Sequence, residues 1–482
     1  MKISDIILKE EYLLSVADDN LEFNTIVTDP SKVNEDTLLI IPNSERFKEG
    51  LKLNQMPVAI ICDTNCILPD NIPFIRVENP RVATANAFFR SEKISTDKLT
   101  IIGITGTNGK SSTAMLIKAI LMGCGHRVGY IGTGKIEIGD KTISDAHYSM
   151  TTPDPEVLYK SIKKMQNDGC DTIVMEVSSH SLALDKVSPL MFDYTVFTNL
   201  SSEHIDFHGS VEEYFRAKLK LFARSKCGVF NIDDKKVRLA YDLCKSRKLS
   251  AGIIWRGDVW ASNIENHGLE GISYLYHGGG FSFKMNLKLS GSYNVYNSLL
   301  AATVCIDMGC KPCEVKRIIS EITTLPGRFE IINGRISVII DYAHTDSAFE
   351  NIMKELAILK GNKKLTVVFG CGGNRDREKR PKMAAIAEKY ANRIILTSDN
   401  SRNEDIKNII SDIIRGFSQG KYEVIENRRD AIRAALLYAD DQEIIAIIGK
   451  GPEKYNIDHT GYSDFDEKAI ILSTLEERTV IR

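Results

Sequence analysis

Short runs of β-branched and other apolar residues alternate with amphipathic segments of helical length along almost the whole chain. This alternation is typical of parallel sheets wound with helices, and it argues against β-sandwiches and helical bundles. A chain of 482 residues has the length of about three ordinary domains. We therefore predict an α/β fold of three domains with mostly parallel strands.

Two interruptions of this pattern predict where the domains meet. Residues 91–98 are polar and have no apolar period, which is typical of a linker. Near residues 325–328 a helical run ends at a proline and a glycine before a new strand pattern begins. We therefore divide the chain into a small N-terminal α/β domain (1–97), a central domain (98–326) and a C-terminal Rossmann-like α/β domain (327–482).

Composition excludes several classes of protein. Lys and Arg number 62 against 64 Asp and Glu, and the net charge of -2 provides no basic surface for nucleic acid. The longest apolar stretches, such as 444–448, are strand-sized and far short of the ~20 residues that span a bilayer, so we expect no membrane insertion. The ten cysteines are thinly spread and the first residues do not resemble a secretion signal. A cytoplasmic protein is expected.

A glycine-rich turn lies between the strand-like run 101–104 and a helical segment. Glycines let backbone N–H groups approach phosphate oxygens, a helix N-terminus adds partial positive charge, a lysine bridges the terminal phosphates and a hydroxyl binds Mg²⁺. The spacing departs from the common pattern because Ile104 replaces the first glycine, and a chance glycine-rich turn is the alternative. We predict a phosphate-binding P-loop made of Gly106, Thr107, Asn108, Gly109, Lys110, Ser111 and Ser112. Such a loop alone does not name a reaction, because kinases, GTPases, transport ATPases and ligases all use it.

Two further side chains are candidate metal ligands. Glu176 follows the apolar run 172–175 and so lies at the carboxyl end of a strand, where open α/β sheets bind ligands. His204 lies in a loop after the run 195–198 and supplies a second ligand from the neighbouring edge. Magnesium prefers oxygen, so a histidine ligand keeps Mn²⁺ open as a second choice. The alternative is a core carboxylate and a loop histidine satisfied by hydrogen bonds.

Several motifs downstream of the P-loop resemble those of the Mur ligases. They are MEVSSH at 175–180, FTNL at 197–200, EHIDFHG at 203–209, NVYN at 294–297, GRFE at 327–330, DYAHT at 341–345 and GCGGNRDR at 370–377. The resemblance runs from about Val77 to the C-terminus, and it is strongest to the ligases that add the third residue of the peptidoglycan stem peptide. It implies an N-terminal domain for the UDP-linked substrate, a central P-loop ATPase domain and a C-terminal domain for the amino acid.

The resemblance implies an ATP-dependent, ADP-forming amide ligase that uses Mg²⁺. It would add meso-diaminopimelate to UDP-N-acetylmuramoyl-L-alanyl-D-glutamate through an acyl phosphate, as a cytoplasmic monomer without nucleic-acid partners. Three alternatives remain open: the same reaction with L-lysine, a related ligase recruited to another pathway, and a nucleotide-binding regulator without ligase activity. The retained Lys110, Glu176, His204 and Lys218 argue against the regulator.

The resemblance also assigns residues to the nucleotide and metal sites. Lys218 would carry a carbamate formed from CO₂ (N6-carboxylysine), and would complete a catalytic set with Lys110, Glu176 and His204 and a metal-binding set with Ser111, Glu176 and His204. By composition alone, a surface lysine is the alternative. Contacts with adenine, ribose and phosphate fall to residues that would otherwise be ordinary cap or turn residues. These are Asn294, Asn297, Arg328, Asp341 and His344.

For the UDP-muramoyl dipeptide, the resemblance assigns Thr151, Thr152, Ser178 and Lys186, the last of which is Arg in most relatives. Lysine keeps the charge and loses the bidentate fork. In the N-terminal domain Ser31 lies in the turn Asp29-Pro30-Ser31-Lys32, where relatives have an Asp-Ser-Arg turn that meets the uridine.

For the incoming amino acid, the turn Asp399-Asn400-Ser401-Arg402 resembles an Asp-Asn-Pro-Arg turn in relatives that use meso-diaminopimelate. Its arginine suits the distal carboxylate of that substrate, which L-lysine lacks. A solvated turn arginine is the alternative. The other implied contacts are Arg375, Gly449 and Glu453.

Overall fold

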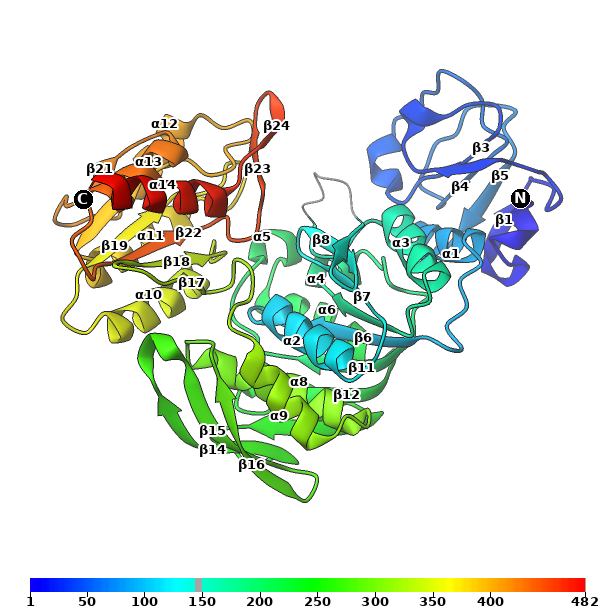
Figure 1. The fold of residues 1–482 in the computed structure, drawn as a ribbon. Helices are drawn as coiled ribbons and strands as arrows, with labels where there is room; N and C mark the ends of the chain where they lie inside the picture. Colours follow the sequence, from blue (N-terminus) through cyan, green and yellow to red (C-terminus); the bar gives the residue numbers. More distant parts are fainter. Residues whose placement is uncertain (144–149, 482) are drawn as a thin grey trace.

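In the computed structural model, which describes residues 1–143 and 150–481, the chain forms three α/β lobes that follow one another in sequence (Figure 1). Their main sheets have five, eleven and six strands. The predicted α/β class with mostly parallel strands is confirmed. Residues 144–149 and 482, which belong to the predicted central and C-terminal domains, lie outside the described residues, and the predicted domain boundaries stay predictions.

The N-terminal sheet has the strand order β1-β5-β4-β3-β2. β1 pairs antiparallel with β5, and the other neighbours pair in parallel. Helix α1 (Pro80–Ser91) follows the sheet, and its first turn is capped by the Asn79 side chain, with Pro80 at the first helical position. The strands are β1 (Tyr12–Ser15), β2 (Thr25–Val27), β3 (Thr37–Ile40), β4 (Ala59–Cys62) and β5 (Phe74–Val77).

The central sheet has the order β16-β15-β14-β13-β12-β11-β6-β10-β7-β8-β9. β6 lies between β10 and β11 and runs parallel to both, so the three strands present their carboxyl ends at one edge. The strands are β6 (Thr100–Thr105), β7 (Val128–Gly132), β8 (Lys135–Ile138), β9 (Lys141–Thr142), β10 (Thr172–Glu176), β11 (Phe192–Phe197), β12 (Ser225–Asn231), β13 (Arg247–Gly252), β14 (Val259–Asn266), β15 (Ile272–Gly278) and β16 (Phe281–Leu287).

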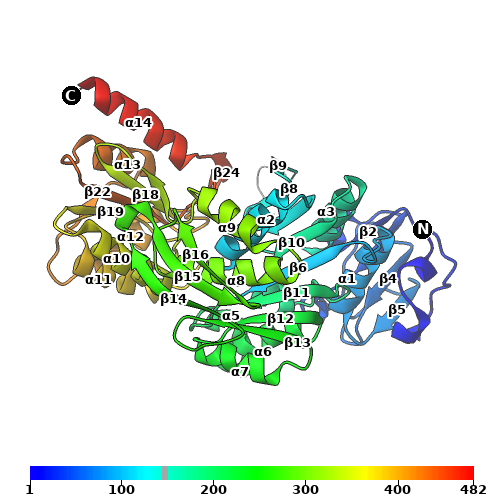
Figure 2. The same ribbon diagram turned by 60° about the horizontal axis from the view of Figure 1, so that its bottom comes forward.

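Helices cover both faces of the central sheet, which explains why its inner strands are apolar on both sides. α2, α8 and α9 pack on one face, and α3, α4, α6 and α7 pack on the other, where α1 packs against α3. Figure 2 shows β14 to β16 at the edge of this sheet on the side of the C-terminal lobe. The helices are α2 (Lys110–Gly123), α3 (Pro155–Asn167), α4 (Ser179–Ala183), α5 (Ile205–His208), α6 (Val211–Phe222), α7 (Lys235–Leu243), α8 (Tyr293–Asp307) and α9 (Pro312–Glu321).

The C-terminal sheet has the order β17-β18-β22-β19-β20-β21, with β17 antiparallel to its neighbour. α10, α11 and α12 pack on one face, and α13 and α14 pack on the other. The strands are β17 (Glu330–Ile332), β18 (Ser337–Asp341), β19 (Leu365–Phe369), β20 (Arg393–Leu396), β21 (Glu423–Val424), β22 (Ile444–Ile448) and the hairpin β23 (Tyr455–Asp458) and β24 (Gly461–Asp464); the helices are α10 (Asp346–Lys360), α11 (Lys379–Tyr390), α12 (Ile406–Ile414), α13 (Arg428–Leu437) and α14 (Glu467–Ile481).

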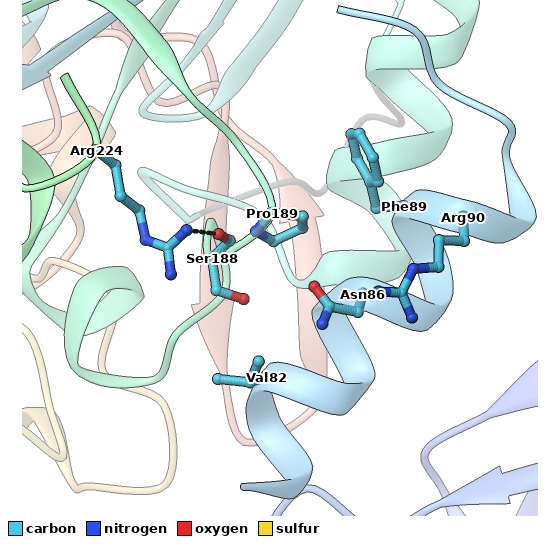
Figure 3. Close-up of a pocket in the computed structure, with 7 residues that line it drawn as sticks. All are labelled: Val82, Asn86, Phe89, Arg90, Ser188, Pro189 and Arg224. Atoms are coloured by element: carbon cyan, nitrogen blue, oxygen red, sulfur yellow. Dashed lines mark hydrogen bonds between the residues drawn. The ribbon is translucent and has the colours of Figure 1, made fainter. Parts of the chain in front are cut away.

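A cavity of about 380 Å³ lies where α1 meets the central lobe (Figure 3). The Arg224 guanidinium donates a hydrogen bond to the carbonyl oxygen of Ser188 at its wall. The cavity is lined by Val82, Asn86, Phe89 and Arg90 of α1 and by Ser188, Pro189 and Arg224. None of these seven residues belongs to the predicted catalytic, nucleotide or substrate sets.

Across the described ranges, 1–143 and 150–481, no helix combines the length and the apolar character that crossing a membrane requires.

Candidate active site

The predicted P-loop connects the carboxyl end of β6 to the first residue of α2, Lys110. Gly106 (φ +150°) and Gly109 (φ +83°) have backbone conformations that side chains rarely adopt. A Cβ at Gly106 would collide with the Thr198 hydroxyl, and one at Gly109 would lie 2.5 Å from Asn297 Oδ1. The loop therefore needs both glycines. It packs directly against Thr198, which follows β11, and against Asn297 of α8.

Lys110 folds back over this loop. Its Nζ donates to the carbonyl oxygens of Gly106 (2.9 Å) and Thr107 (2.8 Å). Burial lowers the pKa of Lys110, while the carboxylates of Glu203 and Glu176 act to raise it. These influences place the cation close to both carboxylates, at the mouth of the loop where the terminal phosphates of a nucleotide would lie.

Glu176, the last residue of β10, is fully buried beside the P-loop. Its Oε1 accepts hydrogen bonds from the Tyr130 hydroxyl (2.7 Å) and the Thr133 amide (3.1 Å), and its Oε2 accepts one from the Ser111 hydroxyl (2.8 Å). The Arg328 guanidinium donates to the same Ser111 hydroxyl at 2.8 Å. The structure thus joins Ser111 and Glu176, two predicted metal ligands that came from separate motifs.

His204 caps the short helix α5 with a left-handed backbone (φ 55°). Its ring centroid lies 4.8 Å from that of His180 and 6.2 Å from that of Tyr214. Desolvation and the cations Lys110 and Lys218 lower the pKa of His204 to about 4. The imidazole is therefore neutral at pH 7, the form that binds metals.

Lys218 is buried on α6 with 1% of its surface exposed, so the surface-lysine alternative is wrong. Its Nζ lies 2.9 Å from the carbonyl oxygen of Gly106 and 3.4 Å from the Thr105 hydroxyl, and it stands over the Tyr214 ring at 4.6 Å. Burial lowers the pKa of Lys218 well below its ordinary value, and Lys110 lowers it further. A lowered pKa raises the fraction of uncharged amine, which is the form that reacts with CO₂.

The predicted nucleotide contacts come from two lobes. Asn294 and Asn297 are buried on α8, where Asn297 Nδ2 donates to Asn294 Oδ1 at 3.0 Å. Asp341 ends β18 and accepts the amide N–H groups of Phe329 and Ala343, each at 2.7 Å. Burial raises the pKa of the Asp341 carboxyl.

Arg328 and His344 lie between the C-terminal lobe and the P-loop. The Arg328 guanidinium stands 4.5 Å above the Tyr342 ring, and its Nε is buried and unpaired within the described residues. His344 is solvent-exposed by surface area, and desolvation by the surrounding protein together with the neighbouring cation Lys379 lowers the pKa of its imidazole to about 4. These features fit a nucleoside triphosphate bound with a divalent cation. The glycine-rich loop and the unpaired Arg328 Nε suit the phosphates, and the adjacent oxygens of Ser111 and Glu176 suit the cation.

The residues predicted for the UDP-muramoyl dipeptide gather in part around the end of β10. The Thr152 hydroxyl donates to the carbonyl oxygen of Glu176 (3.0 Å) and accepts the Ser178 amide (3.0 Å), and the Thr151 hydroxyl lies 3.0 Å from that of Thr133. Lys186 lies beside the same segment, since its Nζ is 2.7 Å from Asp154 Oδ1 and 3.9 Å from Met150 Sδ. Ser31 is elsewhere, in the N-terminal lobe, where it donates to Asp29.

The residues predicted for the amino acid come together at the carboxyl edge of the C-terminal sheet. Asn400 Nδ2 donates to Glu453 Oε2 at 2.8 Å, and Asn400 Oδ1 accepts the Ile457 amide at 3.0 Å. A Cβ at Gly449 (φ +127°) would lie 2.7 Å from Asp399 Oδ2, so this close approach requires glycine. The turns after β20 and β22 are therefore locked together.

Two arginines stand beside these carboxylates. Arg402 has a left-handed backbone (φ 54°), and its Nη1 donates to the carbonyl oxygens of Gly373 (3.0 Å) and Asn400 (3.2 Å). Arg375 is exposed by surface area, and partial desolvation and the neighbouring Arg402 charge lower the pKa of its guanidinium, which Glu453 acts to raise. Arg375 thus has one guanidinium, that of Arg402, and one carboxylate, that of Glu453, among its charged neighbours.

Two charged residues that lie among the predicted site residues were not themselves predicted. Glu203 lies close to the Lys110 and Lys218 ammonium groups, since it acts to raise the pKa of both. The sequence feature that could have identified Glu203 is its position directly before the predicted metal ligand His204. Lys450 is fully buried, and its Nζ donates to Asn400 Oδ1 at 2.7 Å, 3.9 Å from Asp399 and 3.7 Å from Glu453. No local pattern marks a lysine in a glycine-rich turn as buried.

Within the described residues, no group of three or more His, Cys, Asp or Glu side chains is arranged to hold a metal ion. The predicted metal-binding set therefore depends on the Ser111 hydroxyl and on an added carboxylate at Lys218. Unmodified, the Lys218 ammonium would repel a cation.

The fold and this site define an ATP-dependent ligase of three lobes. The family model described as "Mur ligase middle domain" matches residues 104–305, and that described as "Mur ligase, glutamate ligase domain" matches residues 327–451. The chain belongs to the Mur ligase family, whose members are ATP-dependent, ADP-forming amide ligases.

Curated relatives and solved structures agree with this assignment. The UDP-N-acetylmuramoyl-L-alanyl-D-glutamate–2,6-diaminopimelate ligase 1 of Clostridium acetobutylicum is 36% identical over 99% of this chain and 100% of its own. The corresponding ligase of Caldanaerobacter subterraneus subsp. tengcongensis is 41% identical over 87% of each chain. A solved structure of a ligase with the same name has a TM-score of 0.67 at 25% identity and covers 99% of both chains.

Proposed function

We propose that this chain joins meso-diaminopimelate to UDP-N-acetylmuramoyl-L-alanyl-D-glutamate, with hydrolysis of ATP to ADP and phosphate, in peptidoglycan precursor synthesis. The curated relatives named above carry that activity in their names. The observation that carries the amino-acid choice is that Arg375 has both Arg402 and Glu453 as charged neighbours, in a site where Asn400 donates a hydrogen bond to Glu453. The far end of meso-diaminopimelate bears both a carboxylate and an ammonium group, and this site offers partners for both charges.

The reaction needs an activated carboxylate because amide formation in water is uphill. The γ-phosphoryl group of ATP passes to the D-glutamate side-chain carboxylate, and the amine of the amino acid then attacks the acyl phosphate and expels phosphate. Lys110 and the P-loop N–H groups hold the transferring phosphoryl group in line. The Arg328 guanidinium, which comes from the C-terminal lobe, adds a second positive charge beside the P-loop. A bound Mg²⁺ would neutralise phosphate charge. Closure of the lobes would exclude water from the acyl phosphate.

We place Mg²⁺ on Ser111, Glu176 and His204, with a carbamate on Lys218 as the further anionic ligand. Three features support the carbamate: the side chain is buried, its Nζ meets neutral oxygens of Thr105 and Gly106, and the nearby His204 is neutral. A carbamate would change this buried cation into a bidentate anion. Mn²⁺ is the second candidate, because an imidazole ligand suits it better than Mg²⁺.

The remaining residue roles form part of the same proposal. The nucleoside of ATP would contact Asn294, Asn297, Asp341 and His344. The other residues of the P-loop would contact the phosphates of ATP. The UDP-muramoyl dipeptide would bind Thr151, Thr152, Ser178, Lys186 and Ser31. We propose a monomer that acts in the cytoplasm, where ATP and UDP-linked sugars are made.

Two of the alternatives differ from the proposal in one substrate, and the third, a regulator, differs in lacking turnover. L-lysine would leave Arg402 and Arg375 without an anion, which disfavours it. A ligase from another pathway would reject the UDP-muramoyl dipeptide, and a regulator would bind ATP without turnover. Phosphate release measured with each substrate omitted in turn separates them. We expect release to require ATP, UDP-muramoyl dipeptide and meso-diaminopimelate together. Release without the dipeptide, or no release with all three, would contradict the proposal.

A further inference from the structure

The turns that form the amino-acid site share one anchor, a buried arginine outside the predicted substrate set. Arg428 is the first residue of α13 and has 2% of its surface exposed. Its Nη1 donates to the carbonyl oxygen of Ser398 at 3.2 Å, and its Nη2 donates to the carbonyl oxygen of Ile448 at 3.0 Å. Ser398 directly precedes Asp399, and Ile448 directly precedes Gly449. One guanidinium therefore holds the starts of both turns.

The Ser398 peptide is held on both sides by the same segment. Its N–H donates to the carbonyl oxygen of Glu426 at 3.0 Å, and its carbonyl accepts from Arg428. On the other turn, Gly449 approaches so closely that a Cβ would lie 3.8 Å from Arg428 Nη2 and 2.7 Å from Asp399 Oδ2. A displacement of the guanidinium would therefore move Asp399, Asn400 and Gly449 relative to one another.

The third donor of Arg428 reaches the C-terminal helix. Its Nε donates to Glu467 Oε1, and both side chains of this pair are 1% exposed. Glu467 is the first residue of α14, so the pair ties the helix start to the two turns. A lysine has a point charge in place of the planar fork, and it could satisfy Glu467 without reaching both carbonyls.

We propose that Arg428 is a positioning residue for the incoming amino acid, which sets the spacing of the turns after β20 and β22 and is itself held by Glu467 of α14. The inference rests on the proposed function, since it assumes that these turns bind the amino acid. It extends that function by making the start of the C-terminal helix a determinant of amino-acid affinity.

The test is the Michaelis constant for each substrate in Arg428→Lys, measured by phosphate release. The matched control is Arg433→Lys, because Arg433 also joins α13 to α14, through two hydrogen bonds to Glu477, but is partly exposed and contacts neither turn. In Arg428→Lys we expect the KM for meso-diaminopimelate to rise at least about tenfold, while kcat and the KM values for ATP and the dipeptide stay within about twofold. In Arg433→Lys we expect all of these to stay within about twofold.

Equal KM values for meso-diaminopimelate in the two folded variants would overturn the proposal. If Arg428→Lys fails to fold in thermal denaturation, Glu467→Asp is the second variant, because it keeps the ion pair and withdraws the carboxylate by one methylene. A severalfold rise of the same KM is expected there, and an unchanged KM would overturn the proposal. If the wild type ligates a different amino acid, the proposed function fails, and the comparison is made with that amino acid.

Discussion

Replacing Arg402 by alanine should remove most of the preference for meso-diaminopimelate over L-lysine. One nitrogen of its guanidinium donates to the carbonyl oxygens of Gly373 and Asn400. A guanidinium has five donors, and the rest have no hydrogen-bond acceptor among residues 1–143 and 150–481. Truncating one partner of a desolvated charge pair costs about 2–5 kcal/mol. Arg402 is half-buried and Arg375 remains as a second cation. We therefore expect the lower part of this range, about 2–3 kcal/mol.

This free energy corresponds to a roughly 30- to 150-fold loss of kcat/KM for meso-diaminopimelate. L-lysine lacks the distal carboxylate, so its kcat/KM should change by less than about threefold. The assay is the initial ligation rate with each amino acid at the same ATP and dipeptide concentrations, with Arg433→Ala as an exposed-arginine control. An unchanged ratio of the two kcat/KM values would assign the selectivity to Arg375 or Glu453. A wild-type preference for L-lysine would refute the interpretation of the turn.

Three further outcomes follow from the structure. Gly109→Ala should weaken ATP binding at least about tenfold, because its Cβ would lie 2.5 Å from a side-chain oxygen of α8, whereas Gly125→Ala, with a similarly positive φ but no atom within 4 Å, should bind ATP normally; equal affinities in a nucleotide titration would contradict this. Lys218→Ala should lose ligation and regain part of it with a short-chain carboxylate, and a near-normal rate without the additive would exclude the carbamate. The Arg380 hydrogen bond lowers the pKa of Glu404 to about 2, below the ~4.3 of an unfolded chain, so this contact stabilises the fold at neutral pH and its contribution is lost as the pH falls toward 2. The unfolding free energy of Glu404→Gln should therefore lie below that of the wild type at pH 7 and approach it in acid, and a constant difference across the titration would contradict the assignment.

The parts of the site that the sequence predicted are those with a local cause. The P-loop is recognisable because glycines, a lysine and hydroxyl residues follow one another between a strand and a helix, and the structure has β6, the loop and α2 in that order. Glu176 was predicted at a strand end because an apolar run precedes it, and it is the last residue of β10. Each of these features is set within about ten residues of sequence.

The parts that the sequence missed depend on contacts between distant segments. The burial of Lys218 arises because α6 packs its Nζ against Gly106, 112 residues away. The buried Lys450 ammonium donates a hydrogen bond to Asn400 Oδ1, 50 residues away in the sequence. Composition and periodicity assign lysine and arginine to the surface, and nothing local shows which of them meets a buried acceptor.

The central claim is that this chain activates the dipeptide carboxylate as an acyl phosphate before meso-diaminopimelate attacks it. The most direct test supplies UDP-N-acetylmuramoyl-L-alanyl-D-glutamate labelled with ¹⁸O in the D-glutamate side-chain carboxylate, and analyses phosphate and product by mass spectrometry. The account predicts that each turnover transfers one labelled oxygen to inorganic phosphate and yields the UDP-muramoyl tripeptide that contains meso-diaminopimelate. Unlabelled phosphate, or label in AMP, would contradict it.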